Sequence, residues 1–252
     1  MNASNETAFV LAKTSRPRSN RPVLRSRLFQ RLDELRHASL TWIAGPPGCG
    51  KTTLVSSYLA ERDISGLWIQ LDSDDADVAT FFFYVSRALE QAAVRDGPAL
   101  PTLLPEYIPN VMTFTRRCAE IIAARIDRPA AIVLDNYEQV HAEAALHDVI
   151  RELASSLPQG LSLFVLSRTE PPAAYARLRL NESLALLDGQ ELNLTRDEAL
   201  TLAIGQKRDP SCWLPRSFTI HRTVPATVCD RVTSTADGAM RNGIAIGLGL
   251  LI

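Results

Sequence analysis

The stretch Ser39-Leu-Thr-Trp-Ile-Ala-Gly-Pro-Pro-Gly-Cys-Gly-Lys-Thr-Thr53 decides the fold of this chain. Its first six residues are mainly apolar, aromatic or β-branched, and they predict a buried strand over residues 39–44. A glycine-rich turn follows, and a helical pattern begins at Thr52 and runs to Glu61. The order strand, G-x-x-x-x-G-K-[ST] loop and helix is the arrangement that wraps a phosphate chain.

Each residue type in this loop has a chemical task. Glycines let the backbone turn its N–H groups towards an anion, and the helix that follows adds the positive end of its dipole. Lys51 supplies a charge for the β and γ phosphates, and the Thr52 hydroxyl is placed to ligate Mg²⁺. We therefore predict that the whole loop binds nucleotide: Gly45, Pro46, Pro47, Gly48, Cys49, Gly50, Lys51, Thr52 and Thr53.

The rest of the chain alternates short apolar runs with longer helical patterns, which is typical of βα units on a parallel sheet. Further strands are expected over residues 66–71, 130–134, 161–166 and 184–187, and further helices over 76–93, 113–126 and 143–156. The predicted fold class is α/β, a P-loop NTPase with a parallel sheet of about five strands flanked by helices. After residue 204 no period is visible, so an irregular C-terminal tail is expected.

Polar residues at two other predicted strand ends complete the candidate site. Asp135 ends the 130–134 run, where a carboxylate could hold the metal opposite the loop together with Thr52. Asn136 cannot take a proton from water, so Glu138 is the nearest candidate for a general base. Arg168 follows the next strand and has the donors to contact a γ phosphate, although a solvated loop arginine is the alternative.

Composition narrows the function classes. With 46% hydrophobic residues, 22% charged residues and a net charge of −1, the chain is globular and has no overall charge bias towards nucleic acid or membrane. Four cysteines without a CxxC pair argue against structural zinc and for a reducing, cytoplasmic setting. The longest apolar run, residues 243–252, is too short to span a bilayer, and the N-terminus has no secretion signal.

Several other residues have structural explanations. The aromatic run from Phe81 to Tyr84 is expected in the core of a helix-packed layer. Leucines at helical spacing within the basic segment from Lys13 to Arg36 predict a docked helix with a solvated basic face: Leu24, Leu28, Leu32 and Leu35. The scattered histidines are expected at the surface or at helix caps: His37, His141, His147 and His221.

Taken together, the motifs resemble a known family. The segments that carry the likeness are residues 23–28, 44–53, 68–75, 133–137, 167–172 and 176–179. In this order they resemble the nucleotide-binding domain of the large LuxR-type regulators similar to the maltose-operon activator, within the STAND class of signalling NTPases. The resemblance covers about residues 10–204 and implies an N-terminal segment, 1–36, with the adenine-side helix, an NTPase domain, 37–204, and an unassigned tail, 205–252, that is truncated or read out of frame.

The resemblance also implies a function. Arg25 would lie by the adenine, Lys51, Thr52 and Asp135 would hold ATP or ADP with Mg²⁺, and Arg168 would sense the γ phosphate. Many members have a second acid where this chain has Asn136, so slow or no hydrolysis is expected. The implied role is an ATP-binding switch in a transcription regulator, with self-association in the ATP state and no specific DNA binding by this chain alone. Two alternatives stay open: a P-loop enzyme, such as a small-molecule kinase or ATPase, and a nonfunctional fragment.

Overall fold

The computed structural model describes residues 11–17, 24–92 and 95–205, and of residues 202–205 only the backbone. The chain divides into two compact units, with the boundary between Asn193 and Leu194. The tail from 206 onwards, including Cys212, His221, Cys229 and the apolar run 243–252, lies outside the described residues, as does Val23. The boundaries at 36/37 and 204/205 therefore stay predictions.

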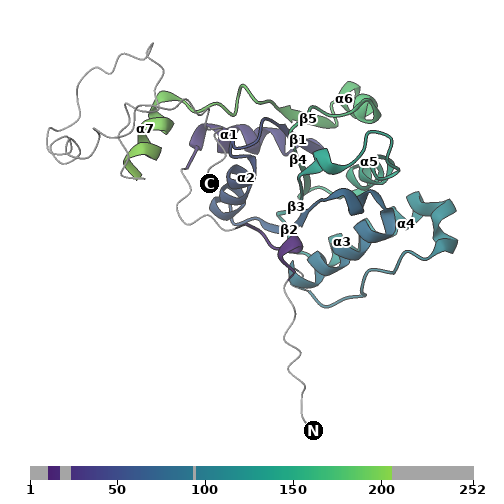
Figure 1. The fold of residues 1–252 in the computed structure, drawn as a ribbon. Helices are drawn as coiled ribbons and strands as arrows, with labels where there is room; N and C mark the ends of the chain where they lie inside the picture. The colour runs from purple at the N-terminus through teal and green to yellow at the C-terminus, as the bar shows by residue number, and fades with distance from the viewer. Residues whose placement is uncertain (1–10, 18–23, 93–94, 206–252) are drawn as a thin grey trace, which may run out of the picture. The chain divides into compact units, whose positions relative to one another are not determined.

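The first unit is built on a parallel sheet of five strands in the order β2-β3-β4-β1-β5 (Figure 1). The strands are β1 (Leu40–Ala44), β2 (Ser65–Gln70), β3 (Ala130–Asp135), β4 (Leu161–Ser167) and β5 (Leu184–Leu187). β4 pairs on one side with β1, Ala44 opposite Ser167, and on the other with β3. All five predicted strands and the parallel α/β class are thus confirmed.

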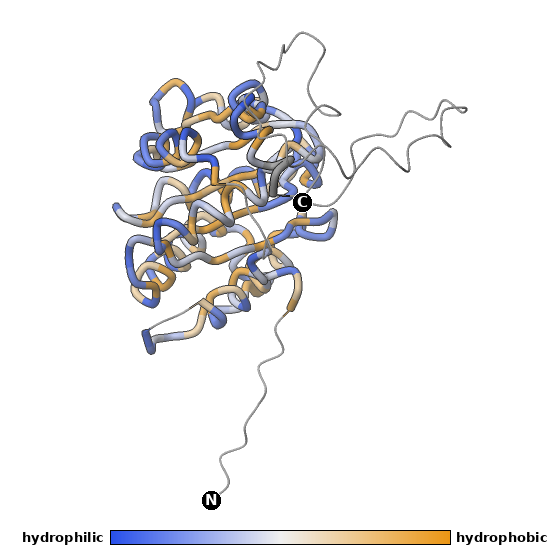
Figure 2. Tube along the Cα trace, turned by 90° about the vertical axis from the view of Figure 1, so that its left-hand side faces the viewer, coloured by the Kyte–Doolittle hydropathy of each residue, from blue (hydrophilic) through white to orange (hydrophobic). Residues whose placement is uncertain are grey.

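Alternate side chains of each strand enter different cores, as the period of two requires. On one face Ile43, Trp68 and Phe164 pack with α1 (Ser26–Leu35) and α2 (Lys51–Glu61). On the other face Trp42 and Ile132 pack with α3 (Val78–Ala92), α4 (Val111–Arg125) and α5 (Leu146–Ser156). The sheet is therefore buried on both sides, which explains why its strands are nearly continuous apolar runs. Figure 2 shows hydrophobic stretches of the chain in the middle of the molecule's folded part.

Shorter elements complete this unit. They are the 3₁₀ turns η1 (Ala12–Thr14), η2 (Ser73–Ala76), η3 (Pro105–Asn110), η4 (Tyr137–Gln139) and η5 (Ala173–Tyr175), and helix α6 (Ala176–Leu180). In the second unit α7 (Arg196–Gly205) begins with a reciprocal cap, in which Thr195 Oγ1 accepts from the Glu198 amide and Glu198 Oε2 accepts from the Thr195 amide.

Residues 11–17 are tied to the β2 side of the sheet. Lys13 Nζ lies 2.7 Å from carboxylate oxygens of Asp72 and Asp75 and 4.0 Å from the centre of the Tyr84 ring. At the other end of this segment, the Pro17 carbonyl accepts a 2.6 Å hydrogen bond from Ser56 Oγ in α2. The expected solvated basic face is therefore wrong for Lys13, whose charge is paired with two aspartates. In α1 the docked helix is confirmed for Leu28, Leu32 and Leu35, whereas Leu24 lies before the helix and is exposed.

Two other structural expectations need correction. In the aromatic run Phe81 and Phe82 are buried, but Phe83 is 52% exposed because helix geometry turns it away from the layer that its neighbours enter. His147 is not a surface or capping residue: it lies in α5 and is 2% exposed. The helix expected from residue 143 begins only at Leu146, because the chain before it bends through turns.

Candidate functional site

The glycine-rich loop, residues 45–50, leaves the end of β1 and delivers the chain into α2. Gly50 has φ +87°, a left-handed conformation that side chains with a Cβ rarely adopt. Gly45 is needed for a different reason, because a Cβ there would lie 2.9 Å from both Cys49 Sγ and Leu192 Cδ1. Strand, tight turn and helix start therefore aim the first amides of α2 at the space above the loop.

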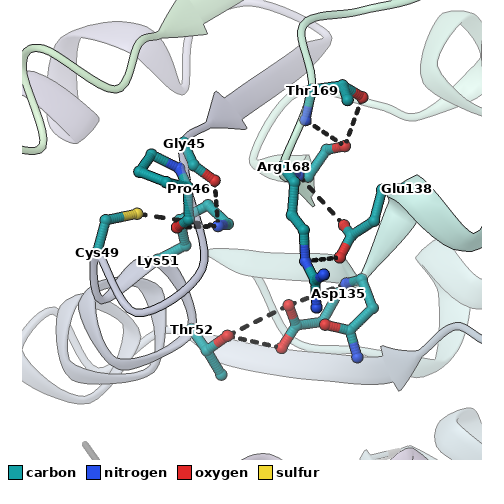
Figure 3. A network of polar contacts seen from close by, with 11 residues as sticks. Gly45, Pro46, Cys49, Lys51, Thr52, Asp135, Glu138, Arg168 and Thr169 are labelled. Atoms are coloured by element: carbon teal, nitrogen blue, oxygen red, sulfur yellow. Dashed lines mark hydrogen bonds and ion pairs between the residues drawn. The ribbon is translucent and has the colours of Figure 1, made fainter. Parts of the chain in front are cut away.

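Lys51 folds its ammonium group into this loop. Its Nζ donates to the carbonyl oxygens of Gly45 at 2.6 Å and Pro46 at 3.1 Å, and lies 3.8 Å from Cys49 Sγ (Figure 3). The two carbonyl acceptors carry no net charge, so these hydrogen bonds do not compensate the charge of the ammonium group. A cation and a helix N-terminus that share one turn form a site for an anion.

Asp135 at the end of β3 meets Thr52 at the start of α2. The Thr52 hydroxyl lies 3.0 and 3.2 Å from the two carboxylate oxygens, and the Asn136 amide donates to Oδ1 at 3.0 Å. Asp135 is only 3% exposed, and burial raises its pKa above the usual range even though these hydrogen bonds act in the opposite direction. The structure therefore places together the two residues that the sequence nominates for a metal.

The Thr52 hydroxyl and the Asp135 carboxylate are oxygen ligands that fit a hard cation, provided that a bound phosphate ligand supplies most of the other oxygens. One carboxylate and one hydroxyl are the type of protein ligand that Mg²⁺ uses when phosphates and waters supply the remaining oxygens. Within residues 11–17, 24–92 and 95–205, no group of three or more histidine, cysteine or acidic side chains could hold a metal by itself. A metal at Thr52 and Asp135 would therefore need further ligands from outside the described residues.

Asn136 directly follows Asp135 and has a left-handed backbone, with φ 60° and ψ 38°. Asparagine and aspartate tolerate this conformation better than other residues with a Cβ. The bend re-aims the chain after β3, so that Asn136 is exposed while Tyr137 turns into the core. The neutral side chain predicted to be unable to act as a base is therefore exposed, directly after Asp135.

Arg168 and Glu138 form an ion pair beside Asp135. β4 lies between β1 and β3 in the sheet. Arg168, which follows β4, therefore lies between the glycine-rich loop after β1 and the turn that follows Asp135 at the end of β3. Arg168 Nε lies 2.7 Å from Glu138 Oε1, and the Arg168 amide donates to Glu138 Oε2 at 3.2 Å (Figure 3). In this arrangement the candidate base and the candidate sensor neutralise each other.

Arg25 anchors the start of α1 to a distant segment. It is 7% exposed, and it donates to the carbonyls of Leu192 at 2.8 Å and Asn193 at 3.0 Å. Leu192 in turn packs near Gly45, so this contact borders the glycine-rich loop. The structure thus brings Arg25 to the side of the loop, and its contact with adenine stays a prediction.

Sequence reasoning missed a buried polar cluster that links the turn after β3 to the turn after β4. Tyr137, His147 and Tyr175, together called the tyrosine–histidine cluster below, share hydrogen bonds: Tyr137 Oη lies 2.8 Å from His147 Nδ1 and is bonded to Tyr175 Oη. Trp42 packs edge-on against both tyrosines, and its Nε1 donates to the Thr169 carbonyl at 3.0 Å. The only signal in the sequence was the position of Tyr137 beside Asp135, since the other members come from distant segments.

Comparison with known proteins agrees with this geometry. Residues 21–166 match the family model for the AAA ATPase domain. The chain is similar to the HTH-type transcriptional regulator MalT of two Klebsiella pneumoniae strains, with 31% identity over 191 residues, 75% of this chain and 21% of theirs. It therefore spans about a fifth of the length of these curated relatives.

Among solved structures, the chain is similar to the STAND protein with a tetratricopeptide repeat sensor PH0952 from Pyrococcus horikoshii. The TM-score is 0.51 at 16% identity, over 83% of this chain and 28% of that one. At this identity the likeness concerns the fold. Within the part of the chain that the structure describes, no helix is both long and apolar enough to cross a bilayer.

Proposed function

The chain belongs to the AAA ATPase domain family, and from this premise we propose that it is an ATP-binding switch domain of a LuxR-type transcription regulator with slow or no hydrolysis. The observation that supports the proposal most is the convergence of Lys51, Thr52 and Asp135 at the carboxyl ends of β1 and β3. The match to MalT supports the regulatory context, and a cytoplasmic location and self-association in the ATP state belong to the same proposal.

In this proposal the residues divide the work. The loop amides and Lys51 bind the phosphates, and Lys51 exchanges its two carbonyl acceptors for phosphate oxygens. Thr52 and Asp135 would hold Mg²⁺, which would neutralise part of the negative charge of the phosphates when it is bound. Arg25 would border the adenine, and Arg168 would contact the γ phosphate and so distinguish ATP from ADP.

Slow hydrolysis follows from the missing base. Asn136 cannot accept a proton, and the carboxylate of Glu138 is engaged by Arg168 through both of its oxygens. A small-molecule kinase, the runner-up function, would need its own base for an acceptor substrate. No observation at this site favours it over the switch.

A thermal shift experiment tests nucleotide binding. The protein is heated with ADP or ATP and Mg²⁺, and a nucleotide at 100 times its Kd should stabilise the fold by about 2.7 kcal/mol. For a domain of this size that corresponds to a rise in Tm of roughly 5–11 °C. Lys51→Ala should abolish the rise, because it removes the cation that lies on the carbonyl oxygens of Gly45 and Pro46 in the glycine-rich loop.

The matched control is Lys13→Ala, which removes a lysine that pairs with Asp72 and Asp75 instead. This variant should melt lower without nucleotide but keep the full nucleotide-induced rise. If the wild-type protein and Lys51→Ala respond alike at saturating nucleotide, the site is assigned wrongly.

A further inference from the structure

The contact between Glu138 and Arg168 occupies the arginine that the proposed function assigns to the γ phosphate. We propose that Glu138 is a specificity-determining residue, which sets the preference between ATP and ADP by holding Arg168 until a γ phosphate competes for it. The inference rests on the proposed function, because it concerns how the same site distinguishes its two ligands.

Glu138 is built as the fixed partner of this pair. Its side chain is 12% exposed, and it follows Asp135 by three residues in η4, so the buried end of β3 positions it. One carboxylate oxygen binds the Arg168 side chain, and the other accepts the Arg168 backbone amide. The glutamate can therefore keep the amide contact when the guanidinium leaves.

Arg168 is the mobile partner. Its side chain is 53% exposed, and Figure 3 shows it extending from the end of β4 towards Asp135. Because β4 lies between β1 and β3, a modest rotation of the side chain keeps it within the space bordered by the glycine-rich loop and Asp135. A guanidinium exchanges one oxyanion for another readily, since carboxylate and phosphate offer it similar acceptor geometry.

The two cations of the site are thus held differently. Lys51 is held by neutral carbonyl oxygens, and it serves phosphates that ADP and ATP share. Arg168 is held by an anion, which only the additional phosphate of ATP would replace. ATP must therefore break the pair between Glu138 and Arg168 when it binds, and this cost lowers its affinity, whereas ADP binds without breaking the pair.

The experiment measures two dissociation constants by calorimetry, for Mg²⁺ with ADP and for Mg²⁺ with a non-hydrolysable ATP analogue. Glu138→Gln keeps an acceptor for the Arg168 amide and removes the charge. A partly exposed ion pair is worth up to about 1 kcal/mol, so the analogue should bind roughly three- to fivefold more tightly, with ADP unchanged. Glu152→Gln, which breaks the 2.8 Å pair with Arg116 on α4, is the matched control and should change neither constant.

A second background separates competition from simple charge repulsion. In Arg168→Gln the additional substitution Glu138→Gln should have no effect on either ligand, because no guanidinium is left to release. If the analogue still gains affinity there, the glutamate acts by repulsion and the proposal is wrong.

The wild-type protein supplies a test that no variant's folding can obscure. Crystal structures with the ATP analogue and with ADP should show the Arg168 guanidinium separated from Glu138 only in the former. If the pair is intact in both, the proposal is overturned. If calorimetry detects neither nucleotide, the proposed function itself fails, whereas binding of both with an unchanged ratio in Glu138→Gln refutes this inference alone.

Discussion

Replacing Tyr137 by Phe tests whether the tyrosine–histidine cluster is a directed chain of hydrogen bonds. His147 Nε2 lies 3.0 Å from the His141 carbonyl, which can only accept, so Nε2 carries the proton. Burial lowers the pKa of His147, which keeps the ring neutral and makes Nδ1 an acceptor. Tyr137 must then donate to Nδ1, and Tyr175 must donate to Tyr137.

This direction predicts unequal costs for two chemically identical changes. Tyr137→Phe deprives both His147 Nδ1 and the Tyr175 hydroxyl of their partner, although Tyr175 Oη is 3.5 Å from Nδ1 and regains a weak contact. Tyr175→Phe removes only a donor to Tyr137, which still donates to His147. Since an unsatisfied buried polar group costs about 1–3 kcal/mol, we expect losses of about 2 kcal/mol for Tyr137→Phe and about 1 kcal/mol for Tyr175→Phe.

Urea denaturation at pH 8, where His147 is neutral in both the folded and the unfolded chain, measures these free energies of unfolding. The matched control is Tyr58→Phe, whose hydroxyl bonds to Asp33 at 2.9 Å; Asp33 keeps its contacts with Arg62 and with solvent. Its loss should be about 1 kcal/mol or less, the usual net value of one hydrogen bond. Equal losses for Tyr137→Phe and Tyr175→Phe, or a larger loss for Tyr175→Phe, would refute the assigned direction.

Three further outcomes are expected. Because burial raises the pKa of Asp135, the folded protein binds that proton more tightly than the unfolded chain, and ionisation costs stability at neutral pH. Asp135→Asn without nucleotide or Mg²⁺ should therefore melt higher at pH 7, and calorimetric scans should show the gain vanish below about pH 4, the ordinary range of a carboxyl group; a lower Tm at pH 7 would contradict this. Steady-state ATP turnover should lie far below the typical enzyme median of about 10 s⁻¹, and Asn136→Asp, which suits the same left-handed backbone, should raise it. An unchanged rate would mean that a carboxylate at this position is not what limits hydrolysis. Finally, titration of this chain against a random duplex and a candidate promoter at physiological salt should show less than about a hundredfold preference, well short of a typical specificity ratio of 10³ or more.

The sequence predicted the strands because each is a short apolar run that a two-sided parallel sheet must bury. The glycine-rich loop could be predicted because its backbone geometry demands particular residue types, and Asp135 because it ends an apolar run. Pairwise contacts were harder to predict. Nothing in the chain between Glu138 and Arg168 indicates that they meet, because their contact depends on β4 entering the sheet next to β3.

His147 shows the same limit from another direction. A single histidine in a helical pattern carries no sign of its partners. Tyr137 and Tyr175 follow β3 and β4, and they meet because these two strands are neighbours in the sheet. Helical spacing predicts a buried face for the run from Phe81 to Tyr84, but four consecutive residues cannot all lie on one face of a helix, and Phe83 is exposed. In both cases the tertiary environment, and not local preference, decides burial.

The segment formed by residues 11–17 has a consequence for the behaviour of the protein at high concentration. Among the strands that the structure describes, β2 pairs with β3 alone, so its other side is an edge of the described sheet; unpaired edges recruit strands from other molecules. η1, purple in Figure 1, packs against β2 and α3. The ion pairs of Lys13 with Asp72 and Asp75 hold it there. Residues 11–17 thus lie against β2, and we expect a protein shortened past them to aggregate more readily through this edge even where the rest of its fold remains intact.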